Sequence, residues 1–181
     1  GLAANPAAGA ITFDIESSKD TNPKNGNTGY TTVDTSLTWT SAEPSTLVAA
    51  QTPAFITFTI GITDALVYGD TVTITARNEA NNADQAIWAA TATQSCTANR
   101  GITGLTSATL NTAKLVITAG GDGIPAGETV FTCTGGLAAN AAANTKTKFN
   151  IVSTKSVTAL DGNDGYQTTA LGQLGWTSAT P

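Results

Sequence analysis

A period-two alternation of threonine with large apolar residues constrains this chain more than any other feature. Residues 71–75 place threonines on either side of Val72 and Ile74, and residues 56–60 repeat the arrangement around Phe58. Side chains along a strand point alternately to opposite faces, so this pattern predicts strands with one buried and one solvated face. Threonine suits the solvated face because its branched Cβ favours extended backbone while its hydroxyl stays in water. The pattern predicts an all-β sandwich.

The composition agrees with a folded domain and excludes several functions. Thr supplies 35 and Ala 30 of the 181 residues, 40% are hydrophobic, and only 12% are charged. That is enough apolar surface for a core, and it excludes a disordered polyelectrolyte. With a net charge of −5 and no cluster of Lys or Arg, we expect no nucleic-acid partner. No run of eighteen apolar residues is present, so we expect no membrane insertion.

Turn-forming clusters of Gly, Pro, Asn and Asp at residues 22–26, 120–123 and 161–165 are expected to separate the strands. Only the alanine-rich residues 2–10 and 137–143 suggest a helical turn. The predicted strands cover residues 10–17, 35–41, 46–50, 54–61, 70–77, 86–94, 107–118, 128–134 and 146–154.

The beginning of the chain is repeated at its end, with an offset that drifts only from about 135 to 137 residues. Such collinear matches predict a tandem repeat of about 136 residues. A fainter internal echo relates residues 66–72 to residues 124–130, either as two similar halves of a sandwich or as common turn chemistry. The main matches are residues 1–8 with 136–143, Phe13-Asp14-Ile15 with Phe149-Asn150-Ile151, residues 27–30 with 163–166, and residues 39–44 with 176–181.

The repeat divides the chain into three parts. Residues 1–34 contain the end of a preceding repeat and a linker. Residues 35–156 form the full repeat, and residues 157–181 begin the next one. In a second arrangement, residues 1–34 act as a donor-strand-like segment that adds to a neighbour's sheet. The segment exchanged would then carry the apolar side chains Ile11, Phe13 and Ile15. We favour the continuous array, because the second copy extends far beyond one donor strand.

The two cysteines, Cys96 and Cys133, are expected to form a disulfide. An even count in a chain without histidine favours a disulfide over a metal site, which would need more ligands. The alternative is a pair of buried, unpaired thiols. A disulfide would place the protein outside the cytoplasm.

Acidic residues near the start of the repeat form a candidate calcium site, whereas residues 161–165, which also resemble a calcium loop, are expected to be a solvated turn; no resident cofactor is otherwise expected. Asp14, Glu16 and Asp34 offer the carboxylate oxygens that calcium prefers. The second copy argues against this site, because Asn150 and Val152 replace Asp14 and Glu16.

We expect the chain not to be an enzyme. It has no His, no Gly-x-Ser-x-Gly motif and no phosphate-binding glycine loop. Three tryptophans could stack on sugar rings, but Trp39 and Trp176 occupy equivalent repeat positions and are expected to pack between strands. Trp88 is the better candidate for an exposed ligand contact. Threonine hydroxyls also leave O-glycosylation open.

Three further segments carry a resemblance to a known class of repeats. They are Leu66-x-x-Gly69-Asp70-Thr71-Val72-Thr73-Ile74-Thr75, Ser107-Ala108-Thr109-Leu110 and Ile124-Pro125-Ala126-Gly127-Glu128-Thr129-Val130. Over residues 35–156 the chain resembles the tandem immunoglobulin-like (Big-type) β-sandwich repeats of large secreted and cell-surface proteins. It is similar in particular to the Thr/Ala-rich repeats of giant extracellular proteins of microbial algae and some bacteria.

The resemblance implies an extracellular structural module that assembles with neighbouring repeats or subunits of a filament or surface layer. It brings no catalytic residues. The alternative function is a carbohydrate-binding or adhesin repeat that takes glycans as partners.

Overall fold

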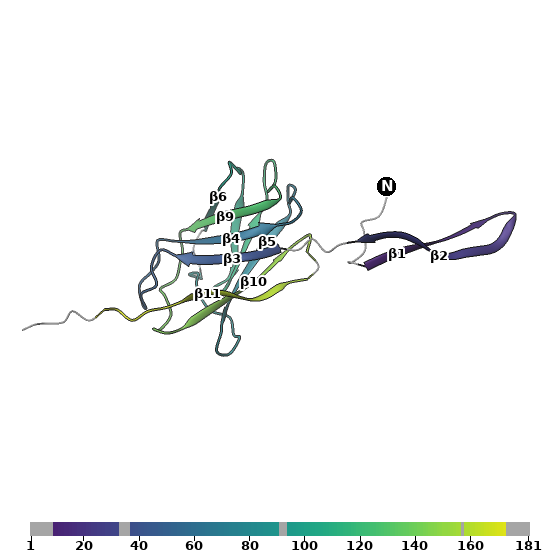
Figure 1. The fold of residues 1–181 in the computed structure, drawn as a ribbon. Coiled ribbons are helices and arrows are strands. Elements are labelled where there is room, and N and C mark those ends of the chain that lie inside the picture. Colours follow the sequence, from purple (N-terminus) through teal and green to yellow (C-terminus); the bar gives the residue numbers. More distant parts are fainter. Residues whose placement is uncertain (1–8, 33–36, 91–93, 157, 173–181) are drawn as a thin grey trace, which may run out of the picture.

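The structure is all-β. The computed structural model describes residues 9–32, 37–90, 94–156 and 158–172, and among them it contains eleven strands and no helix (Figure 1). The prediction of an all-β fold is therefore confirmed. The strands are β1 (Gly9–Ser17), β2 (Asp20–Thr32), β3 (Leu37–Pro44), β4 (Phe55–Ile62), β5 (Thr71–Asn78), β6 (Ser95–Ala98), β7 (Thr106–Asn111), β8 (Lys114–Thr118), β9 (Gly127–Thr134), β10 (Lys146–Ser153) and β11 (Leu160–Gln167).

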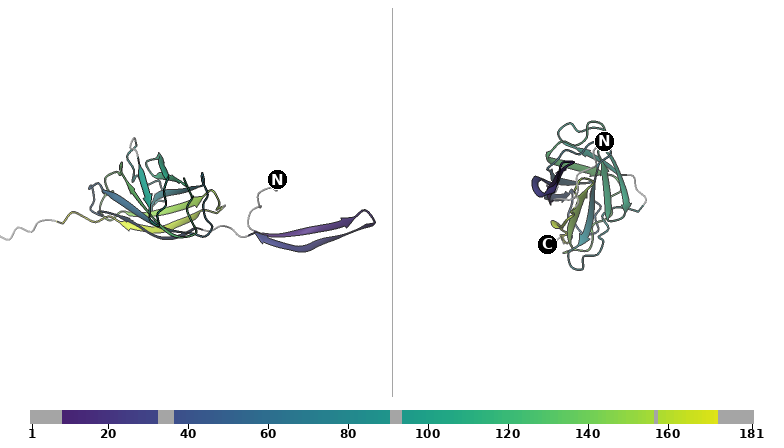
Figure 2. Two further views of the ribbon diagram at one scale, coloured as in Figure 1. Left: turned by 90° about the horizontal axis from the view of Figure 1, so that it is seen from above. Right: turned by 90° about the vertical axis from the view of Figure 1, so that its right-hand side faces the viewer.

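Nine of the strands form two facing antiparallel sheets, which we call the sandwich (Figure 1). One sheet has the order β11-β10-β5-β8-β7 and the other has the order β3-β4-β9-β6. The remaining strands, β1 and β2, form a separate two-stranded sheet beyond one end of the sandwich (Figures 1 and 2). We call this sheet the N-terminal hairpin, and we call β10 with β11 the closing hairpin.

The core consists of the apolar halves of the alternating strands. In β4, Ile56, Phe58 and Ile60 are at most 1% exposed, whereas the threonines between them are only half-buried. Phe131 of β9 lies opposite Phe58 in the same sheet, and both are fully buried. The predicted division into a buried apolar face and an outer threonine face is confirmed for β4, whereas in β9 Thr129 is fully buried.

The two segments that echo each other in sequence pair with each other in space. Leu66 and Ile124 form an antiparallel bridge with reciprocal backbone hydrogen bonds of 2.8 and 2.7 Å, and both side chains are buried. Each segment carries the chain from one sheet to the other, between β4 and β5 and between β8 and β9. This pairing joins the two crossovers, which connect inner strands of the two sheets.

Some of the elements predicted from the sequence are absent from the structure or differ from it. Residues 107–118 form the hairpin of β7 and β8, because Asn111 accepts a hydrogen bond from the Ala113 amide with its side chain and closes a tight turn (2.9 Å). Residues 46–50 and the described part of residues 86–94 make only isolated bridges. Residues 137–143 contain no helical turn, and residues 2–8 lie outside the described part of the chain.

The largest error concerns the Gly- and Asn-rich clusters at residues 22–26 and 161–165. The sequence predicts turns at both, but they lie inside β2 and β11. Each strand accommodates its glycines by register shifts that relax the pairing locally. Because β11 pairs with β10, the sandwich extends beyond residue 156, where the sequence placed its end.

The predicted disulfide between Cys96 and Cys133 is present, with an S–S distance of 2.10 Å. The two residues lie opposite each other on β6 and β9, and both side chains are buried. The bond fixes the short strand β6 to the edge of its sheet.

Replacing both cysteines by alanine should lower the free energy of unfolding by about 4 kcal/mol. This is the chain-entropy value for a loop with a sequence separation of 37 residues. Urea titration of the oxidised protein and of the Cys96→Ala/Cys133→Ala variant measures the difference. Dithiothreitol should destabilise only the wild-type protein, and equal urea midpoints for the oxidised wild-type protein and the variant would contradict the prediction.

Candidate assembly site at the N-terminal hairpin

The N-terminal hairpin carries exposed apolar side chains. Phe13 and Ile15 are 49% and 62% exposed. Within the described residues, no third strand pairs with β1 or β2. Two-stranded sheets are only marginally stable by themselves in water. These features mark the hairpin as the candidate functional site.

The N-terminal hairpin repeats the closing hairpin residue by residue. When 136 is added to both members of four of the pairs in β1–β2, four of the pairs in β10–β11 result. The shared register is therefore a property of the backbone pairing as well as of the sequence. The corresponding pairs are Ala10–Thr31 and Lys146–Gln167, Thr12–Thr28 and Lys148–Asp164, Phe13–Asn27 and Phe149–Asn163, and Ile15–Lys24 and Ile151–Leu160.

The two hairpins also share their irregularities. The Gly26 amide donates a hydrogen bond of 2.8 Å to Oδ1 of Asp14, and the Gly162 amide donates one of the same length to Oδ1 of Asn150. Gly26 and Gly162 have positive φ angles of 69° and 70°, which a side chain would disfavour. The bulges of both hairpins therefore depend on the same chemistry.

A second pair of glycines makes room for the aromatic ring. A Cβ on Gly165 would lie 2.5 Å from Cε2 of Phe149, and one on Gly29 would lie 2.6 Å from Cε2 of Phe13. The phenylalanine of each hairpin thus lies across a glycine of the opposite strand.

In the closing hairpin the equivalent apolar side chains fill the core. Phe149 is fully buried, with its ring centroid 5.2 Å from that of Trp39 and 5.4 Å from that of Phe58. Ile151 is 1% exposed. The indole Nε1 of Trp39 donates a hydrogen bond of 2.8 Å to the Asp164 carbonyl oxygen, which ties β3 to β11.

The turn after β10 is held by Asp70. The hydroxyl of Thr154 donates to Oδ1 of Asp70 at 3.0 Å, and Nζ of Lys155 lies 3.4 Å from its Oδ2. Burial raises the pKa of Asp70, but the Val67 amide, the Thr154 hydroxyl and the charge of Lys155 outweigh it and hold the pKa below its ordinary value.

The counterparts of these turn residues in the N-terminal hairpin are Ser18 and Lys19. A hydroxyl and an ammonium group are thus present at the same positions in both hairpins. The sequence analysis missed this correspondence, although aligning residues 13–19 with residues 149–155 at the same offset would have found it.

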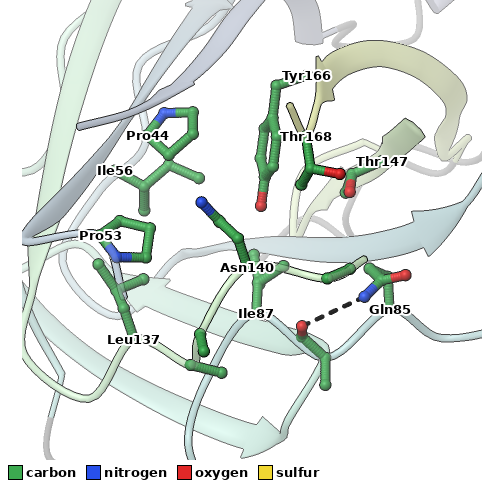
Figure 3. Close-up of a pocket in the computed structure, with 14 residues that line it drawn as sticks. Pro44, Pro53, Ile56, Gln85, Ile87, Leu137, Asn140, Thr147, Tyr166 and Thr168 are labelled. Atoms are coloured by element: carbon green, nitrogen blue, oxygen red, sulfur yellow. Dashed lines mark hydrogen bonds between the residues drawn. The ribbon is translucent and has the colours of Figure 1, made fainter. Parts of the chain in front are cut away.

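The enclosed pocket between β3, β11 and the adjoining loops is almost filled. Tyr166 points into it beside Asn140, whose Nδ2 donates to the carbonyl oxygens of Thr46 and Val48 at 2.8 and 3.0 Å (Figure 3). The remaining cavity of about 10 Å³ has room for one water molecule at most.

Trp88 is not the exposed contact that the sequence predicted. It is 1% exposed and packs near Phe58, with a centroid distance of 6.4 Å. Its backbone pairs with Leu137 in an isolated bridge, so the segment covers the core between the sheets. The neighbouring alanines gave no alternation from which burial could have been predicted.

Of the three calcium candidates, only Asp14 has a side chain in the described part of the chain. Asp14 accepts the Gly26 amide within the hairpin. Asp34 and the side chain of Glu16 lie outside the described part. No group of three His, Cys, Asp or Glu side chains suited to a metal is found among the described residues.

The chain was compared with family models, curated proteins and solved structures, and none of them matches it. Within the described residues, no helix is long and apolar enough to cross a membrane.

The two equivalent phenylalanines should differ sharply in their effect on stability. Phe149→Ala should lower the free energy of unfolding of the sandwich by about 3–5 kcal/mol because it empties a buried site. Phe13→Ala, the matched control, should change it by less than about 0.5 kcal/mol because its ring is half exposed. Urea unfolding followed by tryptophan fluorescence measures both, and similar losses would contradict the assignment of the two environments.

Stability should also fall at high pH through Tyr166. Burial raises the pKa of Tyr166 to about 12, against which a hydrogen bond with Thr147 acts only in part. Between about pH 10 and pH 12 the unfolded chain releases the phenolic proton while the folded chain retains it. Stability is therefore complete below pH 10 and falls by roughly 2 kcal/mol toward pH 12.

Urea unfolding at pH 9 and at pH 11.5 measures this loss, with Tyr166→Phe as the control for the lysines that titrate in the same range. The wild-type protein should lose more stability than the variant between the two pH values. Equal losses would show that Tyr166 ionises alike in the folded and unfolded chains.

Proposed function

We propose that this chain is a non-catalytic structural module of an extracellular filament or cell-surface protein. In this proposal, immunoglobulin-like sandwiches of about 136 residues follow one another in a tandem array. The observation that carries it is the shared pairing register of the N-terminal and closing hairpins on either side of a single sandwich. Two closing elements for one sandwich are what a stretch of a repeating array contains.

The path of the chain supports an arrangement in series. The N-terminal hairpin lies beyond one end of the sandwich, and residues 168–172 run toward the opposite end (Figures 1 and 2). A chain that enters at one end and leaves at the other can place successive units along one axis. Such a geometry suits an extended fibre or stalk.

The disulfide and the outer faces support an extracellular location. Cys96–Cys133 would persist in an oxidising compartment and is uncommon in the cytosol. The half-buried and exposed threonines on the outer faces of the strands offer hydroxyls for O-linked glycans. Both features fit a module exposed at the cell surface.

The alternative, a carbohydrate-binding or adhesin repeat, loses its best-motivated contact because Trp88 is buried. A glycan array is therefore expected to show no binding that depends on this residue.

An antibody raised against the folded protein tests the proposal on intact cells of the source organism. Immunogold labelling should decorate surface structures without permeabilisation. The protein extracted from them should migrate in reducing, denaturing gels far above the 18.2 kDa of this chain. Labelling confined to the cell interior would refute a surface function, and a uniform species of this mass would refute the continuous array.

A further inference from the structure

We infer that the N-terminal hairpin closes a second copy of the sandwich by occupying the place that β10 and β11 occupy in this one. This inference rests on the proposed function, and in a continuous array the second copy is the preceding unit. We call this place the closing site. It comprises the edge of β5 and the rings of Trp39 and Phe58, which β10 and β11 cover.

The chain direction at the closing site shows why a second copy is needed. The indole of Trp39 donates a hydrogen bond to the Asp164 carbonyl oxygen. Further along both segments, Val48 pairs with Thr169 in a parallel bridge. The closing hairpin therefore leaves the sandwich in the same direction in which β3 runs. Adjacent parallel strands cannot be joined by a short turn.

The N-terminal hairpin cannot reach the closing site of its own sandwich. There its last residue, Thr32, would lie where Thr168 lies. Thr168 lines the same pocket as Pro44, which is the last residue of β3. The chain must instead continue to Leu37 at the near end, roughly 23 Å away along the seven residue steps of β3. The five steps from Thr32 to Leu37 span at most roughly 18 Å. The hairpin must therefore act on another copy.

The apolar side chains of the hairpin match the closing site. Phe13 and Ile15 are the same residue types as Phe149 and Ile151 and occupy the same register positions. In the closing site, Phe13 would lie opposite Ala76 and Ile15 opposite Ile74, as their counterparts do. Docking would bury two side chains that are now about half exposed or more, and this burial is favourable.

The polar contacts at the turn also match. Asp70 at the end of the closing site holds the hydroxyl of Thr154 and the ammonium group of Lys155. Ser18 and Lys19 carry the same two groups at the equivalent positions. The hairpin can therefore satisfy Asp70 of the second copy.

Two kinds of contact would be lost. Leu160 packs against the core, whereas Lys24 stands at its position in the N-terminal hairpin, and the ion pairs with Glu79 would also be absent. Lys148 lies 3.3 Å and Lys146 3.6 Å from the Glu79 carboxylate, whereas Thr12 and Ala10 stand at their positions in the N-terminal hairpin. These groups are solvent-accessible, and such pairs contribute little to stability. The loss of these ion pairs does not oppose docking strongly.

In this chain, the closing hairpin is tethered to its own sandwich, which favours it over a hairpin from another molecule. Its effective concentration at the closing site exceeds that of a hairpin from another molecule. The wild-type chain is therefore expected to be monomeric at micromolar concentration, and the test must open the closing site.

The experiment mixes two full-length chains. The acceptor carries Phe149→Ser and Ile151→Ser, which weaken its closing hairpin, together with Phe13→Ser and Ile15→Ser, which disable its own N-terminal hairpin. The donor is the wild-type chain. Light scattering after size exclusion should show a 1:1 species with twice the mass of the 18.2 kDa chain, whether the acceptor folds alone or only on mixing.

The matched control replaces the donor by a chain with only Phe13→Ser and Ile15→Ser. This chain keeps its closed sandwich but lacks the apolar side chains of the hairpin. It should form no such species. A dimer of equal abundance with this chain would overturn the inference, because association would not depend on the hairpin.

A second measurement tests the register in the same mixture of donor and acceptor. Lys148 pairs with Arg77, so Thr12 of one copy should meet Arg77 of another. A donor with Thr12→Cys and an acceptor with Arg77→Cys, mixed in a redox buffer, should give an intermolecular disulfide between the two substituted positions, identified by peptide mapping. An acceptor with Thr73→Cys in place of Arg77→Cys, four residues out of register, should give at least tenfold less of this disulfide.

Failure of both the mixture and the specific cross-link would overturn the inference. That failure leaves the proposed function standing, because surface labelling and native mass do not depend on which element closes each unit. Conversely, a heterodimer with the expected link would establish the closing role even if the antibody labelled the cell interior.

Discussion

The packing of Phe149 against Trp39 and Phe58 joins the parts of this structure. Phe149 belongs to one sheet, Trp39 and Phe58 to the other, and their rings lie 5.2 and 5.4 Å from that of Phe149. Because the phenylalanine enters on the closing hairpin, the core is complete only when a hairpin of this kind is in place. Aromatic contacts of this type contribute beyond their buried area.

The same hairpin occurs twice, and its environment differs. Phe149 and Ile151 of β10 are buried, whereas Phe13 and Ile15 of β1 are 49% and 62% exposed. Local chemistry is common to both copies, including the bulge glycines Gly26 and Gly162 with their side-chain acceptors. A sheet of two strands gains little stability until it packs on a third. The two hairpins therefore differ in whether another sheet covers their apolar side chains, and not in their local chemistry.

Sequence patterns predicted the parts of the fold that depend on local periodicity or on residue type. The threonine alternation located β4 and β5, and the two cysteines predicted the disulfide. The glycine-rich strands β2 and β11 were missed because a glycine in a bulge and a glycine in a turn look alike in sequence. Trp88 was misplaced because its alanine neighbours carry no periodic signal, and its burial depends on Phe58, thirty residues earlier in the chain.

The sequence by itself determined the strand periodicity, the offset of about 136 residues and the side chains that both hairpins present. Only the tertiary structure decided that the two copies keep the same register and that β3 and β11 run in the same direction. It also decided that a connection of four residues cannot return the N-terminal hairpin to its own core. Register and direction depend on backbone hydrogen bonds between distant segments, which no local pattern of residues encodes.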